Sequence, residues 1–85
     1  MTAKEMFNDC GWSYEYIKGD CCEDVIRCKN MNVKNRKSEW DIQFNLMTKI
    51  VVLNDDMRFI SEHILKAILM QILELRWYKW LRIIK

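Results

Sequence analysis

The sequence predicts an α+β fold with a short N-terminal helix, a three- or four-stranded antiparallel meander and a long C-terminal helix packed on the sheet. Apolar residues recur at helical spacing near both ends of the chain and alternate with polar residues between them. The alternating stretches are joined by short connections, which favour antiparallel neighbours. Because 51% of the 85 residues are hydrophobic, residues 1–85 suffice for one modest core and are expected to form a single domain.

The first helix is predicted over residues 3 to about 9. Thr2 and Glu5 have the spacing of a capping box, in which each side chain accepts a hydrogen bond from the other residue's backbone N–H. Ala3 and Phe7 stand four residues apart on one face. Gly11 is placed to end the helix in a left-handed conformation.

Four strands are predicted from residues 12–18, 24–29, 39–45 and 49–53. The alternation is clearest in the third, where Trp40, Ile42 and Phe44 point one way and polar residues point the other way. In the second strand the pattern does not decide which face is buried. The asparagine-rich segment 30–38 is predicted to be a loop.

The last helix is predicted to begin after Ser61, which can cap its N-terminus, with Glu62 in the first turn where the helix dipole favours an anion. Its apolar positions cover one broad face and are expected to pack on the sheet, since a lone meander exposes an apolar face to water. The predicted core is formed by Phe7, Trp40, Ile42, Phe44, Ile64, Leu65, Ile68, Leu69 and Ile72.

The side chains that most often carry chemistry are few and poorly spaced. The chain has one histidine, His63, and four cysteines: Cys10, Cys21, Cys22 and Cys28. They lack the paired short spacing of a zinc site and the setting of an activated nucleophile. With only two glycines there is no phosphate-binding loop. We therefore expect reduced thiols, no metal, no cofactor and no enzymatic activity.

The opening MTAKEMF, followed by Gly-Trp and Tyr-Glu-Tyr, resembles a group of very small proteins of Firmicute phages and prophages. In that group a short helix and a meander precede a C-terminal helix that often ends in Glu-Leu-Gly-Trp. The matching stretches here are 1–16 and 60–77, with the strand F-N…T-K-I-V between them. The resemblance implies a phage accessory protein in the host cytoplasm, with no assigned catalytic residues. Such genes often encode inhibitors of host enzymes or of host defence, including anti-CRISPR proteins.

The chain departs from this group at Leu46-Met47, where the group has a polar turn, and at Arg76, where it has glycine. Glycine would end the helix, whereas arginine is a good helix former, so the helix is predicted to run on. Its far end would then present an apolar stripe away from the sheet. We expect this end to contact a host protein or a second copy, through Arg76, Trp77, Lys79, Trp80, Leu81 and Ile84.

One alternative for this end is a kink near Arg76, after which the tail folds back on its own domain. A second alternative is a nucleic-acid-binding module, in which the strand aromatics Trp12, Tyr14 and Tyr16 stack on bases. Phosphates would then be bound by a basic loop containing Lys29, Lys34, Arg36 and Lys37. The net charge of only +2 weakens that alternative.

A membrane role ranks third. The tail 74–85 resembles an interfacial helix because tryptophans and cations share it. The apolar stretch 64–84 raises the separate question of a membrane span. The charged residues inside 64–84 exclude a membrane span, since each costs roughly 2.5–3.5 kcal/mol at mid-bilayer. Charged residues within the first ten positions also argue against a secretory leader: Lys4, Glu5 and Asp9.

Overall fold

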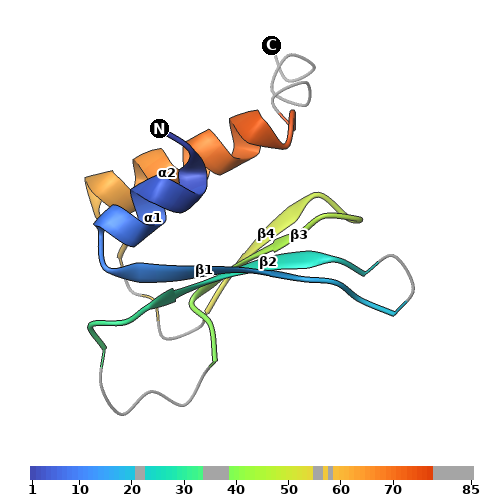
Figure 1. The fold of residues 1–85 in the computed structure, drawn as a ribbon, viewed down its shortest axis with the longest axis horizontal. Helices are drawn as coiled ribbons and strands as arrows, with labels where there is room; N and C mark the ends of the chain where they lie inside the picture. Colours follow the sequence, from blue (N-terminus) through green and yellow to red (C-terminus); the bar gives the residue numbers. More distant parts are fainter. Residues whose placement is uncertain (21–22, 34–38, 55–56, 58, 78–85) are drawn as a thin grey trace.

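The computed structural model of the chain describes residues 1–20, 23–33, 39–54, 57 and 59–77. In these described residues two helices and four strands follow one another in the predicted α-β-β-β-β-α order, and both helices lie on the same side of the sheet (Figure 1). The α+β fold class is confirmed, but the C-terminal helix has 13 residues and is not long. The elements are α1 (Ala3–Asp9), β1 (Trp12–Ile17), β2 (Val25–Asn30), β3 (Ile42–Asn45), β4 (Ile50–Leu53) and α2 (Glu62–Glu74).

The sheet is the predicted antiparallel meander, with strand order β1-β2-β3-β4. One row of opposed residues runs across all four strands, from Tyr14 through Cys28 and Ile42 to Leu53. Residues opposite one another share a face of the sheet. This row and its neighbour through Ile26 therefore define the face that is packed beneath the helices.

Helix α1 has the predicted capping box. The Glu5 N–H donates to Thr2 Oγ1 at 3.2 Å, and the Thr2 N–H donates to Glu5 Oε1 at 2.9 Å. Gly11 follows the helix at φ 81°, a left-handed conformation that glycine adopts without strain. Phe7 is fully buried against the sheet, as expected.

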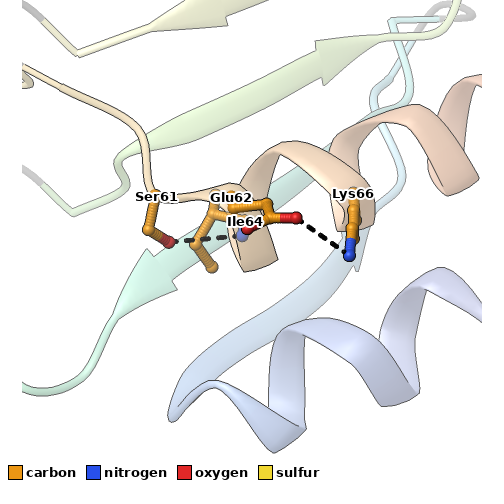
Figure 2. Close-up of polar contacts among 4 residues, drawn as sticks. All are labelled: Ser61, Glu62, Ile64 and Lys66. Atoms are coloured by element: carbon orange, nitrogen blue, oxygen red, sulfur yellow. Dashed lines mark hydrogen bonds and ion pairs between the residues drawn. The ribbon is translucent and has the colours of Figure 1, made fainter.

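Helix α2 begins as predicted with Ser61 as the N-cap. The Ile64 N–H donates to Ser61 Oγ at 3.3 Å, and Glu62 pairs with Lys66 one turn on at 3.2 Å (Figure 2). The exposed ion pair contributes only a few tenths of a kcal/mol. The N-cap supplies a hydrogen bond that the first turn otherwise lacks, so it fixes where the helix starts.

The core differs from the predicted one at Trp40. This residue is half-buried and precedes β3, which begins at Ile42 and not at residue 39. The Asp41 N–H bonds to the carbonyl of Cys28, the residue opposite Ile42, as in a β-bulge. The Asp41 carboxylate accepts from the Asn30 N–H at 2.7 Å, so side-chain bonds replace strand pairing here.

Leu65 and Leu69 were also predicted to be buried, and this is wrong, because both are about half exposed. Helix α1 occupies part of the space above the sheet, so α2 buries only a narrow stripe. That stripe consists of Ile64, Ala67, Ile68 and Gln71.

The predicted continuation of α2 through Arg76 is wrong as well. The helix ends at Glu74, and Arg76 adopts a left-handed φ of 61°, a conformation that favours glycine. The Arg76 N–H bonds to the Leu73 carbonyl and the Trp77 N–H to the Ile72 carbonyl, both at 3.0 Å. These two bonds form a Schellman motif, so the helix ends in a turn at Arg76, in agreement with the predicted alternative of a kink there. The predicted fold-back of the tail after Trp77 lies outside the described residues.

Burial of Trp77 explains why the helix stops there. Its side chain is only 8% exposed, and its ring centroid lies 6.4 Å from that of Phe44. A left-handed residue other than glycine costs about 1–2 kcal/mol. Burying an aromatic side chain stabilises the fold by roughly 1.5–3 kcal/mol, which offsets this cost.

Replacing Arg76 by glycine should therefore stabilise the domain. Arg76→Gly relieves the left-handed strain and is expected to raise the free energy of unfolding by about 0.5–1 kcal/mol, measured by urea denaturation. Arg76→Ala is the control, because it removes the guanidinium group but keeps the strained Cβ. Equal effects of the two variants would contradict the strain explanation.

Replacing Phe44 should have the opposite effect. Phe44→Ala removes a fully buried ring that contacts both Phe7 and Trp77, and should cost about 3–5 kcal/mol. The control Leu69→Ala truncates a half-exposed side chain and should cost about 1 kcal/mol or less. Thermal melts of both variants measure the difference, and similar melting temperatures would contradict the assigned core.

Candidate contact surfaces

The residues predicted to form a C-terminal contact surface are separated by the fold. Trp77 belongs to the core and is not available to a partner in this conformation. Arg76 is exposed at the end of α2. The remaining members of the set, Lys79, Trp80, Leu81 and Ile84, lie outside the described residues.

The predicted stacking face on β1 is not formed. Trp12 and Tyr14 point toward the helices, with ring centroids 5.9 and 6.1 Å from that of Phe7. Tyr16 is exposed, but its hydroxyl donates to the Asp24 carboxylate across the β1–β2 connection. Stacking on several bases needs exposed rings on one surface, and these three side chains do not provide it.

The basic residues predicted beside that face are separated from it as well. Lys29 lies opposite Ser13, so its side chain is on the other face of the sheet from Trp12 and Tyr14. Lys34, Arg36 and Lys37 lie outside the described residues.

The face of the sheet turned away from the helices carries a hydrogen-bonded row of polar side chains. Both helices lie on the opposite side, and no described element covers this face (Figure 1). We call it the open face. Its residues are Ser13, Glu15, Ile17, Val25, Arg27, Lys29, Gln43, Asn45, Ile50 and Val52.

A row of hydrogen bonds crosses the centre of the open face. Arg27 Nε donates to Gln43 Oε1 at 2.9 Å, and Gln43 Nε2 donates to Asn45 Oδ1 at 2.6 Å. These two hydrogen bonds fix the orientation of the Arg27 guanidinium group, because Arg27 is bonded to Gln43 and Gln43 is in turn held by Asn45. No carboxylate among the described residues forms an ion pair with Arg27, although Glu15 lies opposite it on β1.

Arg27 stands between two hollows in the open face. The larger one has a volume of about 420 Å³ and extends over β2 and β3 toward the β3–β4 turn at Met47 and Thr48. The smaller one, of about 270 Å³, lies over β1 and β2 on the other side. Arg27 and Ile17 line both of them. A guanidinium group fixed between two hollows can donate hydrogen bonds to a carboxylate of a partner protein, while neighbouring side chains of that partner fill the hollows.

A second surface is apolar and lies on α2. Leu65, Leu69 and Leu73 follow one another at successive turns and are 48%, 49% and 52% exposed. We call these three residues the leucine ridge. Isolated exposed leucines are common on protein surfaces, but a row of them along one helix marks a surface suited to contact.

Two ionisable groups of the core hold their protons more tightly than usual. Burial raises the pKa of the Cys28 thiol to about 12. Burial also raises the pKa of Tyr14 to about 12, with a smaller contribution from the nearby Cys28 and Glu74, while its hydrogen bond to Gln71 opposes the shift. A thiol with this pKa is neutral at physiological pH and is a poor nucleophile.

At the sheet edge, Tyr16 and Asp24 form an exposed pair. The hydrogen bond that Tyr16 donates lowers the pKa of Asp24, helped by the Gly19 N–H at 3.0 Å, and the same bond raises the pKa of Tyr16. Through these hydrogen bonds, Asp24 holds the β1–β2 connection at Gly19 against Tyr16 of β1. Because both groups are exposed, we assign it a local structural role.

Comparison of the chain with family models, curated proteins and solved structures gave no match. Among the described residues, no three His, Cys, Asp or Glu side chains gather where they could hold a metal ion. No helix in the described part of the chain has both the length and the hydrophobicity to cross a membrane. The function therefore has to be argued from the two surfaces.

Sequence reasoning missed the Arg27–Gln43–Asn45 row. The alternation of 42–45 places Gln43 and Asn45 away from the core, but the pattern of β2 left its buried face undecided. Only the register, which sets Arg27 opposite Gln43 and Ile26 opposite Phe44, brings the row together. Apolar side chains prefer to stand opposite one another on neighbouring strands. Pairing Ile26 with Phe44 on that ground would have set Arg27 opposite Gln43 and so revealed the row.

The raised pKa values of Cys28 and Tyr14 predict a loss of stability at alkaline pH. The unfolded chain releases these protons near pH 9 and 10, whereas the folded chain keeps both until about pH 12. Above pH 9 the unfolded state therefore binds fewer protons, and the free energy of unfolding falls as pH rises. The slope is at most roughly 1.4 kcal/mol per pH unit for each group.

Urea denaturation at a series of pH values measures this loss. In Cys28→Ala the decline between pH 9 and about 10 should become shallower, because only the folded wild type protects that thiol. Lys4→Ala, an exposed change on α1, should leave the profile as in the wild type. Parallel profiles for Cys28→Ala and the wild type would contradict the assignment.

Proposed function

We propose that this chain is a non-enzymatic contact protein that binds a host protein through the open face of its sheet. The observation that carries the proposal is Arg27, fixed by Gln43 between two hollows and without a carboxylate partner among the described residues. Arginine is enriched at the energetic centres of protein interfaces, and a side chain fixed in advance loses little entropy on binding.

The charges of the open face favour a protein over a nucleic acid. Glu15 and Lys29 lie beside Arg27, so the face carries both signs and does not form the basic surface that phosphates require. The aromatic residues of β1 point to the other side. Among the described residues, the cations that could bind phosphates and the aromatic rings that could stack on bases thus lie on opposite faces of the sheet, which disfavours the nucleic-acid alternative.

The resemblance to phage and prophage accessory proteins supports an inhibitory role in the host cytoplasm. An inhibitor of a host enzyme or defence complex, as anti-CRISPR proteins are, needs a stable surface that blocks its target and no chemistry of its own. A small rigid sheet face meets that requirement. Lys79, Trp80, Leu81 and Ile84 remain a predicted addition to the contact, outside the described residues.

Arg27 variants test this proposal. Wild-type protein is used to retain its target from a Firmicute host lysate, and the purified target is then titrated against each variant by calorimetry. Arg27→Ala is expected to weaken binding by about 30-fold or more, the effect of losing a central interface residue. Arg27→Lys should weaken it as well, because lysine cannot bind a carboxylate in bidentate fashion or keep the bond of Nε to Gln43.

Lys4→Ala is the matched control, since it removes an exposed cation from α1 on the opposite side of the molecule. It should bind the target as the wild type does. Equal affinity of Arg27→Ala and the wild type for the purified target would overturn the proposal. Loss of binding in high salt, together with retention of nucleic acid from the lysate, would favour the nucleic-acid alternative instead.

A further inference from the structure

A line of side chains along β2 connects the two hollows of the open face. Val25, Arg27 and Lys29 are alternate residues of the strand, and Glu23 continues the same alternation just before it. Glu23, Val25 and Arg27 line the larger hollow, and Arg27 and Lys29 line the smaller one. We call these four residues the β2 line. In chain order it carries a negative charge, an apolar side chain and two positive charges.

The hydrogen-bonded row beside this line leaves N–H groups without partners. An arginine side chain can only donate, so Gln43 has to present Oε1 to Arg27 and Nε2 to Asn45. Asn45 then accepts through Oδ1, and its own Nδ2 group is left free of the row. The bond to Gln43 uses Nε of Arg27, and the two Nη groups have no partner among the described residues. Free N–H groups beside a positive charge favour an oxygen anion.

The carboxylates around the β2 line indicate what kind of molecule carries that anion. Glu23 and Asp24 line the larger hollow, and Glu15 and Glu39 line the smaller one. A polyanion would bring further phosphates against these carboxylates. A protein segment can place a carboxylate at Arg27 and a cation near Glu23, so that both ends of the line meet the opposite charge. Charge complementarity therefore favours a protein segment that carries both signs in a fixed order.

The backbone of the open face favours a helix as that segment. Strands β2 and β3 are paired on both sides, so their N–H and C=O groups are used within the sheet and cannot bond to an extended chain lying above them. A helix makes its backbone hydrogen bonds internally and contacts a sheet through side chains alone. Both helices of this chain cover the other face in that way (Figure 1).

The spacing of side chains on a helix matches the β2 line. Alternate residues of an antiparallel strand are roughly 6.8 Å apart, twice the rise per residue. An i, i+4 pair on a helix is separated by about 6 Å along the axis, and the row of such residues is inclined by roughly 26° to the axis. Along the row the separation is therefore about 6.7 Å. Successive i, i+4 side chains of a helix that crosses β2 at this inclination meet the residues of the line one to one.

We propose that the open face binds a helix of its partner protein that carries a basic, an apolar and two acidic side chains at four successive i, i+4 positions. The acidic pair contacts Arg27 and Lys29, and the Nη groups of Arg27 bind one carboxylate in bidentate fashion. The apolar side chain enters the larger hollow beside Val25, and the basic side chain lies near Glu23. This inference rests on the proposed function and identifies the part of the partner that the open face recognises.

Two synthetic helical peptides test the proposal by NMR titration of the isotope-labelled chain. Both consist of alanine and glutamine except at the four positions, and both have about 20 residues, since shorter helices are marginal in water. The acidic peptide carries lysine, leucine, glutamate and glutamate at these positions, and the swapped peptide carries glutamate, leucine, lysine and lysine. The acidic peptide should shift the amide signals of Val25, Arg27 and Gln43. It should bind at least about 10-fold more tightly than the swapped peptide, because like charges facing each other weaken a contact.

Exchanging the charges on the chain provides the matched variant. In Arg27→Glu/Lys29→Glu the order of the two affinities should reverse, because the lysine pair of the swapped peptide then meets two carboxylates. Lys4→Ala should bind both peptides as the wild type does. Melting curves confirm that each variant is folded. The comparison of the two peptides on the wild type needs no variant, so it decides the proposal even if the double variant is unstable.

Three results would overturn the helix. They are equal affinity of the wild type for both peptides, shifts confined to α1 and α2, and shifts at Arg27 that grow with the concentration of the chain alone, which would assign the open face to a second copy. The purified target distinguishes this inference from the proposed function. If Arg27→Ala weakens binding of the target but the acidic peptide does not displace it, the helix is wrong and the proposed function stands. If Arg27→Ala binds the target as the wild type does, the proposed function fails, and the assignment of the helix to the partner fails with it.

Discussion

The contact of Phe44 with two other aromatic rings holds the two layers of this protein together. Phe44 lies in β3, and its ring centroid is 6.4 Å from those of both Phe7 in α1 and Trp77 after α2. Both helices are thus anchored to the same point of the sheet. Because this contact draws Trp77 inward, α2 has to end before it, and Arg76 has to accept a left-handed backbone. The length of α2 therefore follows from the core and not from helix propensity.

Much of the fold was predictable because local signals agreed with the final packing. The capping box at Thr2, the N-cap at Ser61 and the alternation of Ile42 and Phe44 each act within a few residues, and each is found. The errors arise where distant packing overrides a local preference. Arginine favours a helix at position 76, but burial of Trp77 decides otherwise. Leu65 and Leu69 fit a core stripe, but α1 already fills part of that space.

The candidate surfaces were harder to predict for a related reason. A sequence pattern identifies which residues alternate, but an open face and an apolar ridge are defined by what does not cover them. Arg27 acquires its place only through the register with Gln43, and the leucine ridge acquires its exposure only through the position of α1. Neither the place of Arg27 nor the exposure of the leucine ridge follows from the residues next to it in the sequence. The pattern of the strands and the position of the helices both have to be known before either surface can be recognised.

The hydrogen bond between the Ala3 N–H and the Glu74 carboxylate joins helix α1 to helix α2. During synthesis on the ribosome, α1 and the whole meander emerge before α2 exists. Until then the sheet has only one of its two covering helices, and Phe44 lacks Trp77. Exposed apolar strand surface of this kind is prone to aggregation. The nascent chain is therefore most vulnerable in the interval between release of β4 and release of α2, because the core closes only when α2 packs on the sheet.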